Sequence, residues 1–185
     1  RALGLDDFHL AGFSMGGGIA GYYAGEHPEN VKSLLLLDPA GVRTPVPSDA
    51  LRIYEEEGKN ILLYRTPDEF GELVSYLFHR PPPLPWPVKR FFVESLSTDL
   101  RFRRRVSHDI LEGGLACLEG RLGRIQAATL VVWGRNDRVI HPSGAWQFQK
   151  GIEKCRVVIL DACGHMPFVE RRKETERTCL DFLAS

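Results

Sequence analysis

The chain has 185 residues, of which 43% are hydrophobic and 26% are charged. This balance is typical of one soluble globular domain, and it excludes collagen, a coiled coil and a wholly disordered chain. Twenty-four basic side chains stand against 24 acidic ones, so the formal net charge is zero. Nucleic-acid binding proteins carry a strongly basic surface that such a balance does not provide. We therefore expect no nucleic acid among the partners of this protein.

The cysteines and the longest apolar run exclude several further classes. The four cysteines include no C-x-x-C pair and no metal-like cluster with histidine, so we expect free thiols, mostly buried, and no metal. The longest strictly apolar run is the tetrad Leu34–Leu37, which is far too short to span a membrane. The opening residues show no signal peptide pattern. These residues leave the compartment open between the cytoplasm and a membrane surface.

The first forty residues predict a strand, a sharp turn, a helix and a second strand. Residues 8–13 (FHLAGF) are short and apolar, and they end at a glycine-rich turn. The next residues carry Ile19, Tyr22 and Tyr23 at helical spacing before Pro28. The leucine-rich run VKSLLLL, residues 31–37, lacks polar alternation, which is typical of a strand buried on both faces of a parallel sheet. Together these segments form a βαβ unit.

Residues 42–125 predict an inserted helical region, because prolines interrupt segments that otherwise look helical and no strand pattern occurs there. Its best helix has Thr66 as N-cap, Pro67 at the first helical position and Glu69 completing a capping box. An apolar stripe follows on one face of this helix, made of Phe70, Leu73, Val74, Leu77 and Phe78. We interpret a later basic group as a solvated helix face: Arg101, Arg103, Arg104 and Arg105.

The alternation of strand and helix returns in the last sixty residues. The pattern predicts strands over residues 128–134 and 155–162, with helices over residues 142–153 and 167–183. The whole order predicts an α/β fold with a parallel sheet. We therefore expect a core made of residues 1–41 and 126–185, with residues 42–125 inserted between its two parts.

A possible nucleophile stands at the first turn. The residues Gly12-Phe13-Ser14-Met15-Gly16 match the pattern G-x-S-x-G, with a predicted strand before them and a predicted helix after them. A tight strand-to-helix turn exposes the serine hydroxyl, and the helix N-terminus offers N–H groups to a developing oxyanion. The alternative is a glycine-rich turn that only packs tightly or cradles a phosphate. Neither G-x-G-x-x-G nor a P-loop pattern supports that alternative.

A serine nucleophile needs a base and an acid near it. Of six histidines, only His165 lies in a short loop just after the last strand, at the same sheet edge as Ser14. Asp137 follows the preceding strand and gives the chain order Ser, Asp, His that is expected of α/β-hydrolases. Asp38 follows the second strand and is the rival acid, although beside Pro39 it could simply cap the turn. A third carboxyl group, Asp161, lies so close to His165 in the sequence that we expect it to shape the loop.

These segments resemble the α/β-hydrolase fold serine hydrolases, most closely the abhydrolase-domain monoacylglycerol lipases and related bacterial lipases. The resemblance rests on GFSMGG, LLLLDPAG, WGRNDRVIHPSGA and CGHMPFVERRKETERTCLDFLAS, and within the insert on TPDEF and RPPPLPWPVKRFF. It implies Ser14 as nucleophile, Asp137 as acid, His165 as base and the Met15 backbone N–H as one oxyanion donor. It also implies that residues 42–125 form a cap over an acyl pocket, and that no cofactor is needed.

The order of strands departs from the pattern of that family. The resemblance implies a nucleophile after the fifth of eight strands, whereas here it follows the first predicted strand. At roughly 25 to 30 residues for each βα unit, we expect on the order of 100 residues before Arg1 in the intact protein. The chain is then the C-terminal portion of an enzyme, with about four strands, and the loop that donates the second oxyanion N–H lies outside it.

The resemblance implies hydrolysis of carboxylic esters of lipid-like substrates, such as monoacylglycerol, through an acyl-enzyme. We expect a small ester or lipid as the partner. Peripheral association with a membrane is compatible with such a substrate. The sequence predicts no particular oligomeric state. One alternative is carbon–carbon bond hydrolysis of ring-cleavage products, because such hydrolases share the SMGG elbow and the WGR-x-D loop. The non-enzyme alternative is a catalytically silent binding module. Dehalogenase and epoxide-hydrolase chemistry is disfavoured, because those relatives have an aspartate where Ser14 stands.

Overall fold

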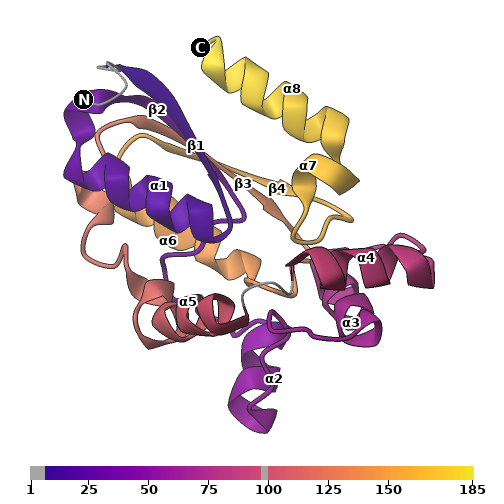
Figure 1. Cartoon of the computed structure of the whole chain (residues 1–185). Coiled ribbons are helices and arrows are strands. Elements are labelled where there is room, and N and C mark those ends of the chain that lie inside the picture. The colour runs from indigo at the N-terminus through magenta and orange to yellow at the C-terminus, as the bar shows by residue number, and fades with distance from the viewer. Residues whose placement is uncertain (1–6, 97–99) are drawn as a thin grey trace.

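A four-stranded parallel sheet forms the centre of the molecule (Figure 1). The computed structural model describes residues 7–96 and 100–185. The strands lie side by side in chain order, β1 (Phe8–Phe13), β2 (Val31–Leu37), β3 (Ala128–Gly134) and β4 (Cys155–Leu160). All three strand pairs are parallel, so the carboxyl ends of the four strands share one edge. The sheet therefore confirms the α/β fold class expected from the sequence.

Helices cover both faces of this sheet (Figure 1). On one face, α1 (Met15–Glu26) and α6 (Ala145–Gly151) pack on alternate side chains of the strands, including Leu34, Leu36 and Val131. On the other face, the intervening side chains contact α8 (Arg172–Leu183). Both sets of strand side chains are buried because the sheet is covered twice. This is why VKSLLLL and ATLVVWG are almost continuously apolar.

The segment between β2 and β3 is helical, as its prolines and apolar spacing predict. It contains α2 (Asp49–Glu57), α3 (Pro67–Leu77), α4 (Trp86–Leu96) and α5 (Leu100–Glu112). The start of α3 is the predicted capping box: the Glu69 N–H donates to Thr66 Oγ1 at 3.2 Å, and the Thr66 N–H donates to Glu69 Oε2 at 3.1 Å. Phe70, Leu73 and Val74 are buried in a small apolar cluster of their own. The insert thus has a second core.

The structure differs from the sequence prediction at helix boundaries. The final helix is two helices, α7 (Pro167–Glu170) and α8, which are separated at Arg171. The predicted helix over residues 142–153 is a short 3₁₀ turn, Pro142–Gly144, followed by α6. The two 3₁₀ turns that follow α5, Gly114–Ala116 and Leu122–Arg124, belong with the main body. Their neighbours there are the buried side chains of Leu118, Leu122 and Ile125, which pack against α1 and the sheet.

The four cysteines are free thiols. Cys163 is buried, and the other three are partly buried. Burial raises the pKa of Cys163 to about 12 and that of Cys155 to about 11, so neither is a thiolate at neutral pH. Within the described residues, each helix is too short or too polar to cross a bilayer.

Candidate active site

Ser14 lies on a strained turn between β1 and α1. Its backbone has φ 53° and ψ −123°, a conformation that L-residues rarely adopt. The Ser14 N–H donates to the Leu37 carbonyl at 3.0 Å, and the Ser14 carbonyl accepts from the N–H groups of Gly17 and Ala40, each at 2.9 Å. A Cβ on Gly12 would lie 2.3 Å from the Gly16 carbonyl oxygen, so only glycine fits there. Hydrogen bonds to α1 and to the residues around the end of β2 thus hold the Ser14 backbone in place.

His165 lies in the loop between β4 and α7, where the insert holds it. Its backbone N–H donates to the carbonyl of Leu77, the last residue of α3, at 2.8 Å. Its ring packs against Phe13, with the two ring centroids 5.0 Å apart. The neighbouring Gly164 has no room for a Cβ, which would come within 2.7 Å of the Leu77 oxygen. The histidine loop and the end of α3 are therefore in direct contact.

Asp137 lies in the loop after β3 and receives four hydrogen bonds. The N–H groups of Val139 and Ile140 donate to Oδ1 at 2.8 Å and 3.0 Å, and the Trp133 indole N–H donates to Oδ2 at 3.1 Å. His165 Nδ1 lies 2.7 Å from the same Oδ2. Four donors from three segments of the chain thus surround this carboxyl group. The arrangement suits a fixed negative charge beside the imidazole.

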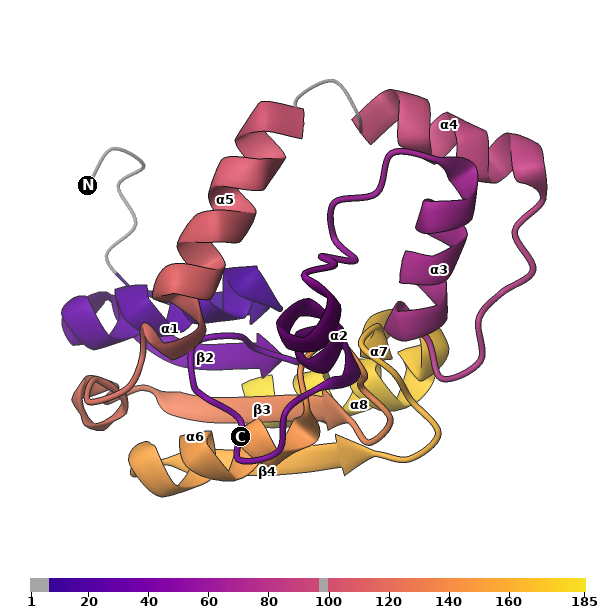
Figure 2. The ribbon, with the colours of Figure 1, turned by 90° about the horizontal axis from the view of Figure 1, so that it is seen from below.

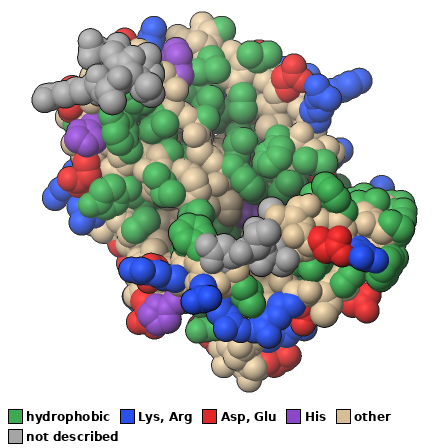
Figure 3. Space-filling model, viewed as in Figure 1, with side chains coloured by type: hydrophobic (Ala, Val, Ile, Leu, Met, Phe, Trp, Pro, Cys, Tyr) green, Lys and Arg blue, Asp and Glu red, His purple; other side chains and the backbone are tan. Residues whose placement is uncertain are grey.

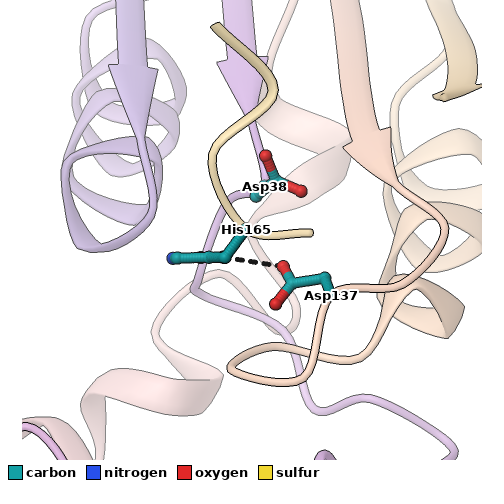
Figure 4. Close-up of side chains that lie close together, drawn as sticks. All are labelled: Asp38, Asp137 and His165. Atoms are coloured by element: carbon teal, nitrogen blue, oxygen red, sulfur yellow. Dashed lines mark hydrogen bonds and ion pairs between the residues drawn. The ribbon is translucent and has the colours of Figure 1, made fainter. Parts of the chain in front are cut away.

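The structure brings the three predicted side chains together. His165 Nε2 lies 2.9 Å from Ser14 Oγ, while its Nδ1 faces Asp137 (Figure 4). With the Nδ1 proton donated to Asp137, the Nε2 lone pair is free to accept the serine proton. Both Asp137 and His165 are buried, at 4% and 2% exposure. The geometry matches that of a Ser-His-Asp triad in chain order.

The rival carboxyl groups occupy different environments. Asp38 is also near His165, but its Oδ1 accepts a hydrogen bond from the Gly134 N–H at 2.8 Å and not from the imidazole. Asp161 is exposed and pairs with Arg135 on the surface. One atom each of Asp38, Asp137 and His165 lie within 4.8 Å of one another, which is a spacing that a metal ion could use. The atoms of Asp137 and His165 are already engaged in the Ser14 hydrogen-bond chain.

An apolar cavity of about 480 Å³ opens at Ser14 and His165. Its walls come from the loops after β1 and β2 and from the insert, and they include Val42, Leu51, Ile61, Leu77, Ile110 and Leu111. One polar pair interrupts this wall, with the Asn60 amide donating to Ser107 Oγ at 2.5 Å. Figure 2 shows α2 in front of the sheet, with α5 on one side of it and α3 on the other. A long apolar group can therefore be held against the serine.

Several supporting residues were not anticipated from the sequence. The Trp133 indole positions Asp137, and the Phe13 ring packs on His165. Glu170 on α7 accepts from the N–H groups of Gly164, His79 and Arg80 at 2.6, 3.1 and 3.0 Å, and so joins the histidine loop to the segment after α3. The only signal for Trp133 and Phe13 was their position inside the motifs WGRND and GFSMG. The sequence carried no signal for Glu170, because all its partners are backbone groups and two of them, His79 and Arg80, are 91 and 90 residues away.

The chain is similar to a known protein family and to several named proteins. A family model described as alpha/beta hydrolase fold matches residues 1–172. The human monoacylglycerol lipase ABHD6 is 33% identical over 185 residues, covering 96% of this chain and 55% of that protein. Lipase 1 of Psychrobacter immobilis is 31% identical over 176 residues, covering 95% of this chain and 55% of that protein.

A solved structure is similar to nearly all of the described fold. The crystal structure of a membrane phospholipase A, described as a novel bacterial virulence factor, is 39% identical with a TM-score of 0.91. That match covers 99% of this chain and 58% of the other. The chain thus spans little more than half the length of the relatives that it matches. The family match over most of the chain, the parallel sheet and the similarity to lipases show that the chain belongs to the alpha/beta hydrolase fold family.

Proposed function

We propose that the chain carries the catalytic centre of a serine hydrolase that cleaves carboxylic esters of lipid-like substrates. One observation carries this proposal: the hydrogen-bond chain Ser14–His165–Asp137 opens into an apolar cavity of about 480 Å³. A polar nucleophile at the wall of an apolar cavity suits an ester with a long acyl chain. The names of the similar proteins, monoacylglycerol lipase and lipase, support the same substrate class.

The reaction follows from the roles that the three side chains can take. His165 Nε2 accepts the Ser14 proton while Ser14 Oγ attacks the ester carbonyl, and Asp137 stabilises the imidazolium that results. The Met15 N–H, at the start of α1, donates to the oxyanion, because the first N–H groups of a helix have no carbonyl one turn earlier. The intermediate expels the alcohol, which takes the proton from His165. Water then attacks the acyl-enzyme by the same route and regenerates Ser14.

We propose that the helices α2 to α5 form the cap over the acyl pocket. Residues of α2 and α5 line the cavity, as do Ile61 and Leu62 between α2 and α3. Arg138, next to Asp137, holds both α2 and α3 beside the loop that follows β3. On α2, Asp49 accepts from the Arg138 guanidinium at 2.6 Å, and the Ala50 N–H donates to the Arg138 carbonyl at 3.0 Å. On α3, the same guanidinium donates to the Ser75 carbonyl at 3.3 Å and lies 4.3 Å from the Tyr76 ring centroid. Within the predicted insert, residues 42–125, we propose that residues 49–112 are the part that covers the pocket, because Val42 before α2 and Leu118 and Leu122 after α5 pack in the main core.

Peripheral association with an anionic membrane fits the surface of this cap. Trp86 and Phe91 on α4 and Phe102 on α5 are 56%, 64% and 62% exposed. The same two helices carry exposed basic side chains, Arg90 on α4 and Arg101, Arg104 and Arg105 on α5. Figure 3 shows apolar and basic side chains on this part of the molecule. Exposed aromatic rings and arginines together suit the interface of an anionic bilayer. Sedimentation with vesicles tests this association. The protein should bind phosphatidylglycerol vesicles more than phosphatidylcholine vesicles, and the variant Trp86→Ser/Phe91→Ser should bind the former less. Equal binding of the unaltered protein to the two kinds of vesicle would contradict the proposal.

The proposed activity is tested with p-nitrophenyl esters of graded chain length and the complete gene product. We expect kcat/KM to rise with acyl length until the cavity is filled, because each buried methylene adds about 0.8 kcal/mol of binding free energy. Ser14→Ala should abolish the activity. Turnover of a ring-cleavage product in place of every ester, at a rate that depends on Ser14, would favour the carbon–carbon hydrolase.

A further inference from the structure

The loop after β2 presents a second buried carboxyl group to the proposed catalytic site. Asp38 is fully buried, at 0% exposure, and its Oδ1 accepts from the Gly134 N–H at 2.8 Å. With both carboxyl groups ionised, its Oδ2 has no hydrogen-bond partner among the described residues. A proton on Asp38 allows a hydrogen bond between its side chain and that of Asp137. Figure 4 shows Asp38 beside Asp137 and His165, on a loop from a different strand. A buried polar atom without a partner is costly, so this carboxyl group requires an explanation.

Only one of the two carboxyl groups can readily carry a charge. Asp38, Asp137 and His165 each place one atom within 4.8 Å of the others, and two carboxylates at this spacing in a buried site repel each other strongly. Asp137 receives hydrogen bonds from Val139, Ile140, Trp133 and His165, whereas Asp38 receives one from Gly134. The negative charge therefore resides on Asp137. Asp38 is the carboxyl group that keeps its proton.

The other groups around Asp38 act in the same direction. The titratable groups that face it are Asp137 on the loop after β3, and Cys163, His165 and Glu170 on the segment after β4. Burial raises the pKa of Asp38 well above its ordinary value of 3.8, and the charges of Asp137 and Glu170 raise it further. The hydrogen bond from Gly134 opposes this rise but is the smaller influence than burial. Of these neighbours, only His165 can become positively charged.

We propose that Asp38 is a reserve carboxyl group: it stays protonated and takes no part in the reaction while Asp137 is charged, and it supplies the counter-charge to His165 when Asp137 is neutral. This inference rests on the proposed function, because it concerns the same site. No bond is made or broken at Asp38 beyond loss of its proton to solvent. With the charge of Asp137 removed, the repulsion that disfavours ionised Asp38 disappears, and an anion within 4.8 Å of the imidazole still stabilises the imidazolium.

A double-variant series in the complete gene product tests the proposal. Asn suits position 38, because the backbone there has φ 41° and asparagine tolerates that region. Asp38→Asn replaces a neutral acid with a neutral amide, so kcat/KM for an ester should stay within about threefold of the wild type at pH 7. In a triad with a single acid, the corresponding Asp→Asn change costs about 10⁴-fold. Here Asp137→Asn should cost only about 10²-fold, and its activity should rise with pH as Asp38 ionises.

The double variant shows whether Asp38 replaces Asp137. Asp38→Asn/Asp137→Asn should fall a further 100-fold or so, to the loss expected without any acid, and its extra rise with pH should disappear. Equal activity of Asp137→Asn and the double variant would overturn the proposal. A large loss in Asp38→Asn alone, with the double variant losing the product of the two single losses, would also overturn it. Ser14→Ala in the same series separates the two ideas, because activity that survives there contradicts the proposed function itself. Thermal unfolding checks each fold, and Asp38→Gly, which also accepts φ 41°, replaces Asp38→Asn if that variant does not fold.

Discussion

Gly12 is the residue on which the shape of the serine turn depends most directly. A methyl group there would lie 2.3 Å from the Gly16 carbonyl oxygen and 2.7 Å from the Gly17 Cα, and both are backbone atoms that cannot rotate away. Gly12→Ala should therefore displace Ser14 and lower kcat by about 100-fold, as expected for a misplacement on the order of 1 Å. Gly113→Ala is the control, since its added methyl group meets nothing within 4 Å. Steady-state kinetics of both variants decide the matter, and equal activities would contradict this account of the turn.

Asp38 predicts a dependence of stability on pH. Because its pKa is raised in the folded state, the folded protein keeps a proton that the unfolded chain releases above pH 3.8. The contribution of this proton to the free energy of unfolding is therefore fully present below pH 3.8. It is lost as the pH rises toward the pKa of Asp38 in the folded state. Across that window the free energy of unfolding should fall by about 1.4 kcal/mol per pH unit relative to Asp38→Asn. Urea unfolding of both proteins from pH 4 to pH 8 measures this difference, and parallel curves would show that Asp38 is not protonated in the fold.

For single residues, the sequence predicted which side chains meet but not how they are charged. The positions of Ser14, Asp137 and His165 just after parallel strands were enough to place them at one edge of the sheet. The choice between Asp137 and Asp38 was harder, because both follow strands. It depends on donors such as the Trp133 indole, whose direction the sequence does not reveal. The raised pKa of Asp38 follows from burial, which is a property of the assembled fold.

The helix α3 divides its apolar stripe between two tasks. Leu73 is 6% exposed and packs inside the small core of the insert, whereas Leu77 also lines the cavity at Ser14. Leu77→Ala should lengthen the cavity and shift the preference among p-nitrophenyl esters toward longer acyl chains. Leu73→Ala should lower stability by about 2 to 5 kcal/mol without changing that preference. Chain-length profiles and urea unfolding of both variants test the division, and the same profile in both would contradict it.

The elements of regular pattern were the ones that could be predicted. The ranges of β1 and β3 match those expected from the sequence, and the capping box at Thr66 fixed the start of α3. The final helix could not be predicted in detail, because its break at Arg171 has no proline or glycine to mark it. The sequence also does not reveal what Leu118 and Leu122 pack against. Leu118 and Leu122 look like residues of a helical insert, but tertiary packing places them beneath α1.

For the whole molecule, the strand β1 sets the expected behaviour of the 185-residue chain. β1 pairs with β2 along one side, and among the described residues no strand pairs with its other side. An unpaired, largely apolar edge promotes aggregation, and Ser14 follows directly from this strand. The resemblance also implies a second oxyanion donor outside these residues, and losing one such donor costs about 100- to 1000-fold in turnover.

We therefore expect residues 1–185, expressed by themselves, to be poorly soluble and to hydrolyse esters at a rate near background. Size-exclusion chromatography and a p-nitrophenyl ester assay, with Ser14→Ala as the blank, measure both properties. The complete gene product, assayed in parallel, shows the rate against which the chain is compared. A monomeric preparation of the chain with ordinary enzymatic turnover, lost in Ser14→Ala, would contradict this expectation.

Covalent labelling distinguishes a Ser14 nucleophile that His165 activates from an ordinary serine. The complete gene product is treated with a fluorophosphonate, and the modified peptide is located by mass spectrometry. We predict one adduct, on Ser14, with a labelling rate that falls by about 10³-fold or more in His165→Ala, because the hydroxyl then has no base at 2.9 Å to accept its proton. Labelling of a different residue, or labelling of Ser14 at an unchanged rate in His165→Ala, would contradict the account.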